Sequence, residues 1–358
     1  MGVDPDRAGI VLAAEVSEAF ARGDHPAAAA FAGEAAAAFL AEQGEPSFDA
    51  PNMLRLRAEA LLALGDHAEA GRALDRADTF AAALPAGDPF DRLLVHLGRL
   101  RGLALLDGGD RPGARAVLTH ALELCERTLG GDDPDAGALH NMLGVVGKFM
   151  GAFHAAAEHY ARALEIYERS GGEQAVLATL YHNLGGLAHS RGDLETAERE
   201  TRRALELHSA CKGPGHPDTA GDRGQLAAIL SELGRHGEAE RELRRTAEDF
   251  AAALGPDHVE VAIARTALGA ALHRVGRLDE ADAAYCEGLA MRERSQGEGH
   301  PMLAPTLLNL SVLCEQRGDD DGARIYARRA AGVLAGGAVT DDHPHLLAAR
   351  ERLAELAS

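Results

Sequence analysis

The sequence predicts an all-α protein that stacks short helix pairs, and three observations support this fold class. Apolar side chains recur at helical spacing on both sides of a tight turn, most clearly in residues 178–206. A composition of 46% hydrophobic and only 4% aromatic residues, without Trp, suits a core of Ala and Leu. Because so short a pair leaves one apolar face uncovered, it needs a similar pair on each side. Glycine marks the turns at a period of about 42 residues, at Gly23, Gly65, Gly109, Gly151, Gly192, Gly234, Gly276 and Gly318.

We expect eight repeats of two helices each, in a single domain that spans residues 1–358. The first repeat is the most degenerate, as expected for a terminal unit with one unpaired side. Repeat 3 follows the longest gap and contains the turn Gly108-Gly109, which accommodates one extra residue. A final helix at 343–357 mixes charged with apolar residues and is predicted to be a solvated cap. The repeats occupy 6–43, 51–84, 89–130, 134–170, 174–212, 217–254, 258–295 and 301–335.

The repeats share further positions relative to the turn glycine. Aspartate follows Gly192 and Gly318, which pairs a residue that tolerates positive φ with a capping side chain. Eight residues before the glycine we expect a buried leucine, at Leu143, Leu184, Leu226, Leu268 and Leu310. Five residues after it, where only a methyl group fits between crossing helices, each repeat has alanine: Ala28, Ala70, Ala114, Ala156, Ala197, Ala239, Ala281 and Ala323.

Histidine recurs at the same period at His216, His258, His300 and His343, in three cases directly before proline. Proline fits the first turn of a helix, where its missing N–H costs nothing. The histidine is then an N-cap. We prefer this structural interpretation to a ligand role, because one repeat period separates these side chains too far to chelate one ion.

Helix pairs with this Leu–Gly–turn-Gly–Ala–Ala pattern resemble the tetratricopeptide repeat (TPR). The period of about 42 residues, against 34 for the common form, is similar to that of the kinesin light chain subclass. The segments between repeats are also similar: GGDDPDAGA (130–138), GPGHPDTA (213–220), LGPDHVEVA (254–262), QGEGHPMLA (296–304) and TDDHPHLLA (340–348). The resemblance covers nearly the whole chain, most strongly from residue 131 onward. It implies a right-handed superhelical solenoid whose first helices line a concave groove that binds extended peptides.

The resemblance also implies groove positions ten, nine, six, three and two residues before each turn glycine. The first two are typically an Asn-Asn pair, whose amides both donate to and accept from a peptide backbone. This chain keeps one amide there in four repeats but breaks the pair in every repeat. Repeats 4 to 8 have Asn141, Met142, Val145, Lys148 and Phe149; His182, Asn183, Gly186, His189 and Ser190; Gly224, Gln225, Ala228, Ser231 and Glu232; Thr266, Ala267, Ala270, His273 and Arg274; Leu308, Asn309, Val312, Glu315 and Gln316.

The position eleven before the glycine is usually apolar but is polar or aromatic here, as His140, Tyr181, Arg223 and Arg265. Two arginines on successive repeats can form bidentate hydrogen bonds with a carboxylate or phosphate of a ligand. The alternative, which we favour, pairs them with nearby acids such as Asp222 or Glu260. The predicted ligand-binding groove residues are His140, Asn141, Lys148, Tyr181, His182, Asn183, His189, Arg223, Gln225, Arg265, Thr266, His273, Arg274 and Asn309.

The groove histidines leave three interpretations open. His182 and His189 lie seven residues apart, about 10.5 Å along a helix, and cannot share one zinc unaided. A metal site would need His140, His154 or His273 from neighbouring repeats. General acid–base chemistry is a further alternative, since imidazole titrates near neutrality. We favour ordinary polar lining of the groove, and predict no metal site and no cofactor.

Charge and motifs limit the classes of function. A net charge of −20 disfavours nucleic acids and anionic membranes, which need a basic surface. No signal peptide or membrane-spanning stretch is indicated, and the four widely spaced cysteines are expected to be reduced thiols in a cytoplasmic protein. The common hydrolase, metalloprotease, P-loop and dinucleotide motifs are absent, so no catalytic residue is predicted.

The sequence thus favours a non-catalytic scaffold or adaptor that binds a protein or peptide segment in the groove, with an undetermined oligomeric state. Two alternatives stay open. One is an enzyme or a small-molecule binder, metal-assisted or not, that uses the His-, Asn- and Arg-lined groove as a pocket. The other is a peptide-responsive regulator that acts through another protein.

Overall fold

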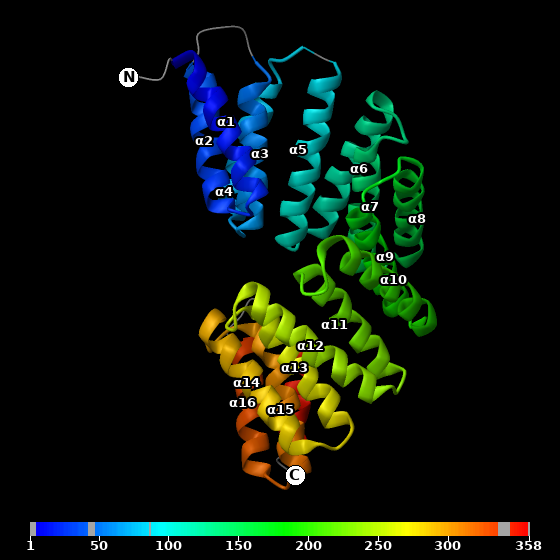
Figure 1. Cartoon of the computed structure of the whole chain (residues 1–358). Helices are drawn as coiled ribbons and strands as arrows, with labels where there is room; N and C mark the ends of the chain where they lie inside the picture. Colours follow the sequence, from blue (N-terminus) through cyan, green and yellow to red (C-terminus); the bar gives the residue numbers. More distant parts are fainter. Residues whose placement is uncertain (1–4, 42–46, 86, 336–343, 357–358) are drawn as a thin grey trace. The chain divides into compact units, whose positions relative to one another are not determined.

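A computed structural model describes residues 5–41, 47–85, 87–335 and 344–356. Within these ranges the chain forms seventeen α-helices and one 3-10 helix, and no strand (Figure 1). Contacts between residues divide it into two compact units, Met1–Glu173 and Gln174–Ser358. The first unit contains α1 (Pro5–Ala21), α2 (His25–Ala41), α3 (Asp49–Ala63), α4 (His67–Ala81), α5 (Asp88–Asp107), α6 (Arg111–Thr128), α7 (Pro134–Phe149) and α8 (Phe153–Arg169). The second contains α9 (Gln174–Ser190), α10 (Leu194–Lys212), α11 (Pro217–Glu232), α12 (His236–Leu254), α13 (Val259–Arg274), α14 (Leu278–Gln296), η1 (Pro301–Leu303), α15 (Ala304–Gln316), α16 (Asp320–Ala335) and α17 (Pro344–Glu355).

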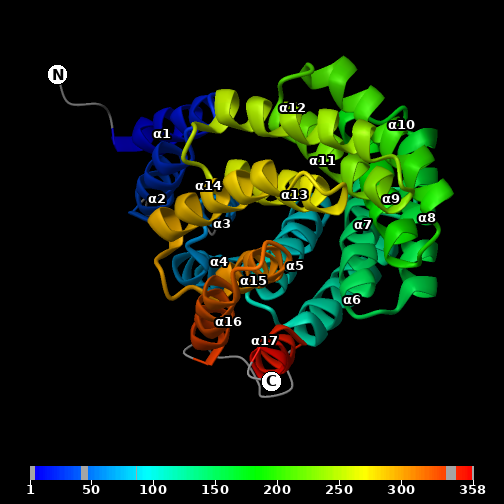
Figure 2. The same ribbon diagram turned by 90° about the horizontal axis from the view of Figure 1, so that it is seen from below.

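Within each unit, consecutive helices pack against one another in pairs (Figures 1 and 2). The predicted all-α solenoid of helix-turn-helix repeats with a final capping helix is confirmed. The cap, α17, buries Leu346 and Ala349 against its unit. Its expected first residue, His343, lies outside the described residues. That the repeats form one continuous domain stays a prediction.

The turns between paired helices confirm the role of the recurring glycines. All eight have positive φ, and Gly234 at φ 76° is typical. A side chain is strained in this left-handed conformation, which glycine adopts readily. The Asp193 carboxylate accepts from Thr196 N at 3.1 Å and Asp319 from Gly322 N at 2.9 Å, so both predicted caps are confirmed.

The small residues predicted at the helix crossings are confirmed. The predicted buried leucines are confirmed with one exception. The alanine five residues after each turn glycine is fully buried in all eight repeats. In repeat 4, a Cβ on Gly147 of α7 would lie 3.2 Å from the Ala156 Cβ of α8, so the two helices cross closely there. Four of the five predicted leucines are buried. The expectation was wrong for Leu184, which is only half-buried.

The histidine caps are confirmed wherever they are described. The Nδ1 atoms of His216, His258 and His300 each accept from a backbone N–H two residues later, at 3.2 Å. An N-cap side chain that accepts in this way satisfies one of the four free N–H groups of the helix start. These imidazoles therefore stabilise helix ends. In the described part of the chain, no helix is long and apolar enough to cross a membrane.

Candidate functional site

In the second unit, predicted groove positions of repeats 6 and 7 come together around a hollow of about 180 Å³. Its walls are the first helices α11 and α13, and Leu243 of α12 contributes to it. The hollow exists because both helices carry glycine or alanine where larger side chains would fill the space. The predicted groove residues that line it are Gly224, Ala228, Ser231, Glu232, Ala267, Ala270 and Arg274.

A ladder of side-chain contacts follows the same face of this unit. In each contact, the residue three positions before one turn glycine meets the residue two positions before the turn glycine of the next repeat. His189 Nε2 lies 2.9 Å from Glu232 Oε1, and His273 Nε2 lies 2.9 Å from Gln316 Oε1. Between these two contacts along the face, Arg274 of repeat 7 donates to the Ser231 hydroxyl of repeat 6. His189, His273 and Arg274, predicted as ligand contacts, thus also tie successive repeats together.

His182 belongs to a buried cluster that the sequence did not predict. The carboxylate of Asp222 on α11 faces two imidazoles: its Oδ1 is 2.7 Å from His182 Nδ1, and its Oδ2 is 2.6 Å from His208 Nδ1. Asp222 is fully buried and His208 is 3% exposed, whereas the His182 side chain is 35% exposed. The Asp222 carboxylate accepts from both rings, so each Nδ1 carries a hydrogen.

Gln225 stabilises the stacking of repeats 5 and 6. Its amide Nε2 donates to the backbone oxygen of His182 at 3.0 Å and to Thr201 Oγ1 at 2.9 Å. A Cβ on Gly185 would lie 2.3 Å from that hydroxyl, so glycine is needed for this approach. The amide nitrogen of Gln225 thus donates to the protein's own backbone, and its predicted ligand role stays a prediction.

The two arginines eleven before the turn glycine have different surroundings. Arg223 is 3% exposed, forms an ion pair with Asp249 and donates to Pro214 O at 3.2 Å. Arg265 is half-exposed and lies 3.1 Å from Glu287. The pairing with nearby acids, which we favoured, therefore holds for both, with partners other than the predicted Asp222 and Glu260.

Among the remaining predicted residues of this unit, Thr266 contacts its own helix. Thr266 Oγ1 donates to Ala262 O at 3.0 Å. Tyr181, Asn183 and Asn309 are half-buried, and the first two have interaction partners. Their predicted ligand roles stay predictions.

In the first unit, His140 pairs with a second histidine that the sequence did not single out. The Nδ1 atoms of His140 on α7 and His159 on α8 lie 2.9 Å apart. Burial, together with the nearby charges of His159 and Arg162, lowers the pKa of His140 to about 4, and burial lowers the pKa of His159. Burial also lowers the pKa of Lys148, whose Nζ lies 5.2 Å from the Phe149 ring centroid. Asn141 is half-buried and partnered.

The histidine pair predicts a loss of stability on acidification. The unfolded imidazoles bind protons near pH 6.5 and the folded pair only at lower pH, so the folded state is penalised as the pH falls from about 6.5 towards 4. The unfolding free energy of the original chain should therefore fall between pH 6.5 and pH 4. With both His140 and His159 replaced by leucine, this fall should be smaller by about 2 kcal/mol. Urea denaturation at the two pH values measures it. The exposed His154→Leu is the control and should behave as the original chain does; equal losses in all three proteins would contradict the prediction.

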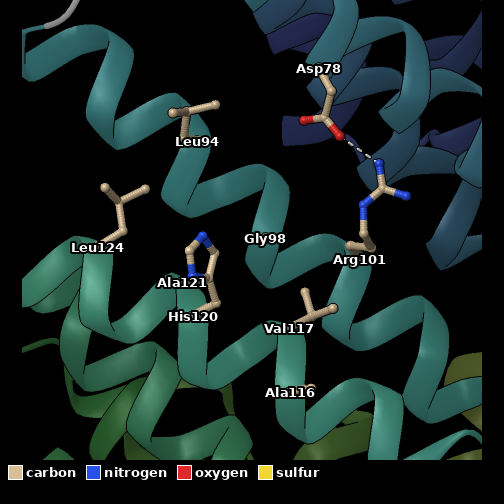
Figure 3. A pocket seen from close by; sticks show the side chains of 9 residues that line it. All are labelled: Asp78, Leu94, Gly98, Arg101, Ala116, Val117, His120, Ala121 and Leu124. Atoms are coloured by element: carbon tan, nitrogen blue, oxygen red, sulfur yellow. Dashed lines mark hydrogen bonds and ion pairs between the residues drawn. The ribbon is translucent and has the colours of Figure 1, made fainter. Parts of the chain in front are cut away.

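A larger hollow, of about 470 Å³, lies in the first unit between α4, α5 and α6 (Figure 3). Arg101 on α5 points to Asp78 on α4, with Nη2 2.6 Å from Oδ2. Leu94, Val117 and Leu124 make the lining largely apolar. None of the predicted groove residues contributes to this hollow.

Among the described residues, no group of three or more His, Cys, Asp or Glu side chains is placed to hold a metal ion. Several polar groups of the second unit pair across successive repeats, among them His189, Gln225 and Arg274. The fold and the candidate site together define a protein of stacked helix pairs with a small-residue hollow on the face of the first helices α11 and α13.

The family model of the tetratricopeptide repeat matches residues 93–169, 176–248 and 222–294. These matches cover more than half of the chain, which therefore belongs to the tetratricopeptide repeat family. Nephrocystin-3 of Mus musculus is 35% identical over 95 residues, which are 26% of this chain and 7% of nephrocystin-3. The chain thus matches only a small part of that relative's length.

Three solved structures are similar in fold. The nearly identical TPR-like repeats of a Podosopora anserina kinesin light chain match with a TM-score of 0.50 and 17% identity, over 59% of this chain and 99% of that chain. They confirm the predicted resemblance to kinesin light chain repeats. The Rap protein complexed with Competence and Sporulation Factor matches with a TM-score of 0.65 and 15% identity, over 99% and 98% of the two chains. NprR in complex with its cognate peptide NprX matches with a TM-score of 0.58 and 13% identity, over 86% and 82%.

Proposed function

We propose that this chain is a non-catalytic scaffold that binds an extended peptide segment across the first helices of its second unit. The observation that supports this most directly is the hollow between α11 and α13. Glycine and alanine leave backbone and space accessible there, while Ser231, Glu232 and Arg274 provide polar groups at its edge. Apolar space with a few polar groups is typical of peptide and ligand sites.

The structural likenesses agree with this proposal at the level of the fold. NprR is solved with a cognate peptide and Rap with Competence and Sporulation Factor. Both share the stacked-helix architecture of this chain. The cytoplasmic location, the enzyme alternative and the regulator alternative stay predictions.

A peptide-display selection with a blocking variant tests the proposal. Peptides selected on the full chain should lose roughly a hundredfold in affinity for Ala228→Arg, since a large charged side chain then occupies the exposed edge of the hollow. Ala253→Arg places the same side chain on an exposed position of α12 that does not line the hollow, and should bind as the original chain does. If no selected peptide distinguishes the two variants, the hollow is not the binding site.

A further inference from the structure

The hollow of the first unit is lined mainly by apolar side chains that remain partly accessible to solvent (Figure 3). We refer to it as the α4–α6 hollow. Leu94 on α5, and Val117 and Leu124 on α6, contribute its large apolar groups, and each is half-buried. Where α5 and α6 cross, a Cβ on Gly98 would lie 2.8 Å from the Ala121 Cβ. The chain therefore places no large side chain of its own at this crossing.

The dimensions of the α4–α6 hollow match one face of an α-helix. Its lining extends from Leu94 to Arg101 on α5 and from Ala116 to Leu124 on α6. These stretches span about 10–12 Å along each helix axis. A cavity of about 150 Å³ holds one benzene-sized group, so a hollow of about 470 Å³ has room for about three. A bound amphipathic helix inserts three such groups, at positions i, i+4 and i+7, which span about 10.5 Å.

The α4 edge of the hollow carries an excess of negative charge. The Arg101 guanidinium forms ion pairs with Asp78 at 2.6 Å and with Asp75 at 3.0 Å. Two carboxylates thus share one cation, and Arg101 is the only Lys or Arg of the described lining. The Asp75 and Asp78 side chains are 70% and 46% exposed, so both are accessible to a ligand. The chain's net charge of −20 also attracts a cationic ligand.

We propose that the α4–α6 hollow docks an amphipathic α-helix of a partner protein, with three apolar side chains on one face and Lys or Arg beside them. The apolar side chains pack against Leu94, Val117 and Leu124. The cation pairs with Asp75 or Asp78, which a single guanidinium does not neutralise. An apolar groove with a complementary charged edge is the arrangement that binds helices in this way. The inference concerns other helices than the proposed peptide groove and does not depend on it.

A designed helical peptide and the full chain test the docking site. The probe is acetyl-Ala-Lys-Leu-Ala-Ala-Lys-Leu-Ala-Lys-Leu-Ala-Ala-Lys-Ala-amide, which places its leucines at i, i+4 and i+7 and its lysines beside them. It should bind in a saturable way and shift the NMR signals of the Leu94, Val117 and Leu124 methyl groups. A counterpart with glutamate in place of each lysine should bind roughly tenfold more weakly, because its carboxylates then face Asp75 and Asp78.

A blocking variant and a matched control show whether the hollow itself is occupied. Ala116→Trp places an indole at an exposed position of the lining and should weaken the lysine peptide roughly tenfold. Ala155→Trp makes the same change at an exposed alanine of α8 that does not line the hollow, and should leave binding unchanged. Neither variant alters the net charge. A difference between them therefore reports the hollow and not a general attraction between a cationic peptide and an acidic protein.

Equal affinity of the two variants for the lysine peptide, equal affinity of the lysine and glutamate peptides, or an absence of the methyl shifts would overturn the docking site. Benzyl alcohol is the probe for the other kind of occupant, a small apolar molecule. If it shifts the same methyl signals at millimolar concentration while the lysine peptide does not, the hollow is a small-molecule pocket and the proposal is wrong.

The outcome is separable from that of the proposed function. A display-selected groove peptide should lose affinity for Ala228→Arg and keep it for Ala116→Trp. The lysine peptide should lose affinity for Ala116→Trp and keep it for Ala228→Arg. Each proposal can therefore fail while the other holds.

Discussion

Replacing His208 by leucine is expected to lower the unfolding free energy of the second unit by about 3–5 kcal/mol. Leucine fills a similar volume but removes the donor 2.6 Å from Asp222 Oδ2. Asp222 is fully buried and would keep only the partly exposed His182 as a partner. The buried Oδ2 of that carboxylate then has no donor from His208, and removing one partner of a buried charged group is strongly destabilising. Hydrogen exchange of the α10 and α11 amides measures the loss.

Two further variants separate the buried pair from a general effect of losing an imidazole. His189→Leu should lower the unfolding free energy by less than about 1 kcal/mol, because the Glu232 carboxylate that it faces is half-exposed. Adding Asp222→Leu to His208→Leu should recover most of the loss, since apolar replacement of both partners of a buried pair is often nearly neutral. If His208→Leu and His189→Leu lose equal amounts, the cluster does not stabilise this unit.

The helix pairs were predictable because local constraints repeat. A turn such as that at Gly234 needs a residue with positive φ, and a crossing such as that at Ala156 needs a methyl group. Both requirements act within a few residues and therefore recur in the sequence at the repeat period. Leu184 shows the limit of this reasoning, because its repeat position is conserved in spacing while its exposure depends on neighbouring helices.

The candidate site was predictable only in part, because its contacts join residues of different repeats. Position within the repeat correctly indicated that Ala228 and Ala270 share one face. It did not indicate that His208, on a second helix, would reach Asp222 fourteen residues later, nor that Gln225 would bond to a backbone oxygen 43 residues away. The only signals were a histidine of a second helix and an aspartate at a first-helix position that is apolar in most repeats. Neither specifies a partner.

Arg223→Met should lower the unfolding free energy of the second unit by about 2–4 kcal/mol. Methionine replaces the apolar stem of Arg223 but removes the closer ion-pair partner of Asp249, which keeps only the more distant Arg245 at 3.9 Å, and it leaves Pro214 O without this donor. The Asp249 side chain is only 20% exposed, so water compensates it poorly. Urea denaturation followed by circular dichroism of the full chain measures the loss.

Arg265→Met is the matched control, because it makes the same change at the same repeat position one unit further along. Arg265 and its partner Glu287 are both exposed to water, and such pairs contribute about 0–1 kcal/mol. Arg223 should therefore be needed for stability and Arg265 should not. Equal losses would contradict the structural role of Arg223. The contrast also decides how ligand studies of the two arginines are interpreted: a loss of peptide binding in Arg265→Met reports a contact, whereas the same loss in Arg223→Met reports a contact only if the variant remains folded.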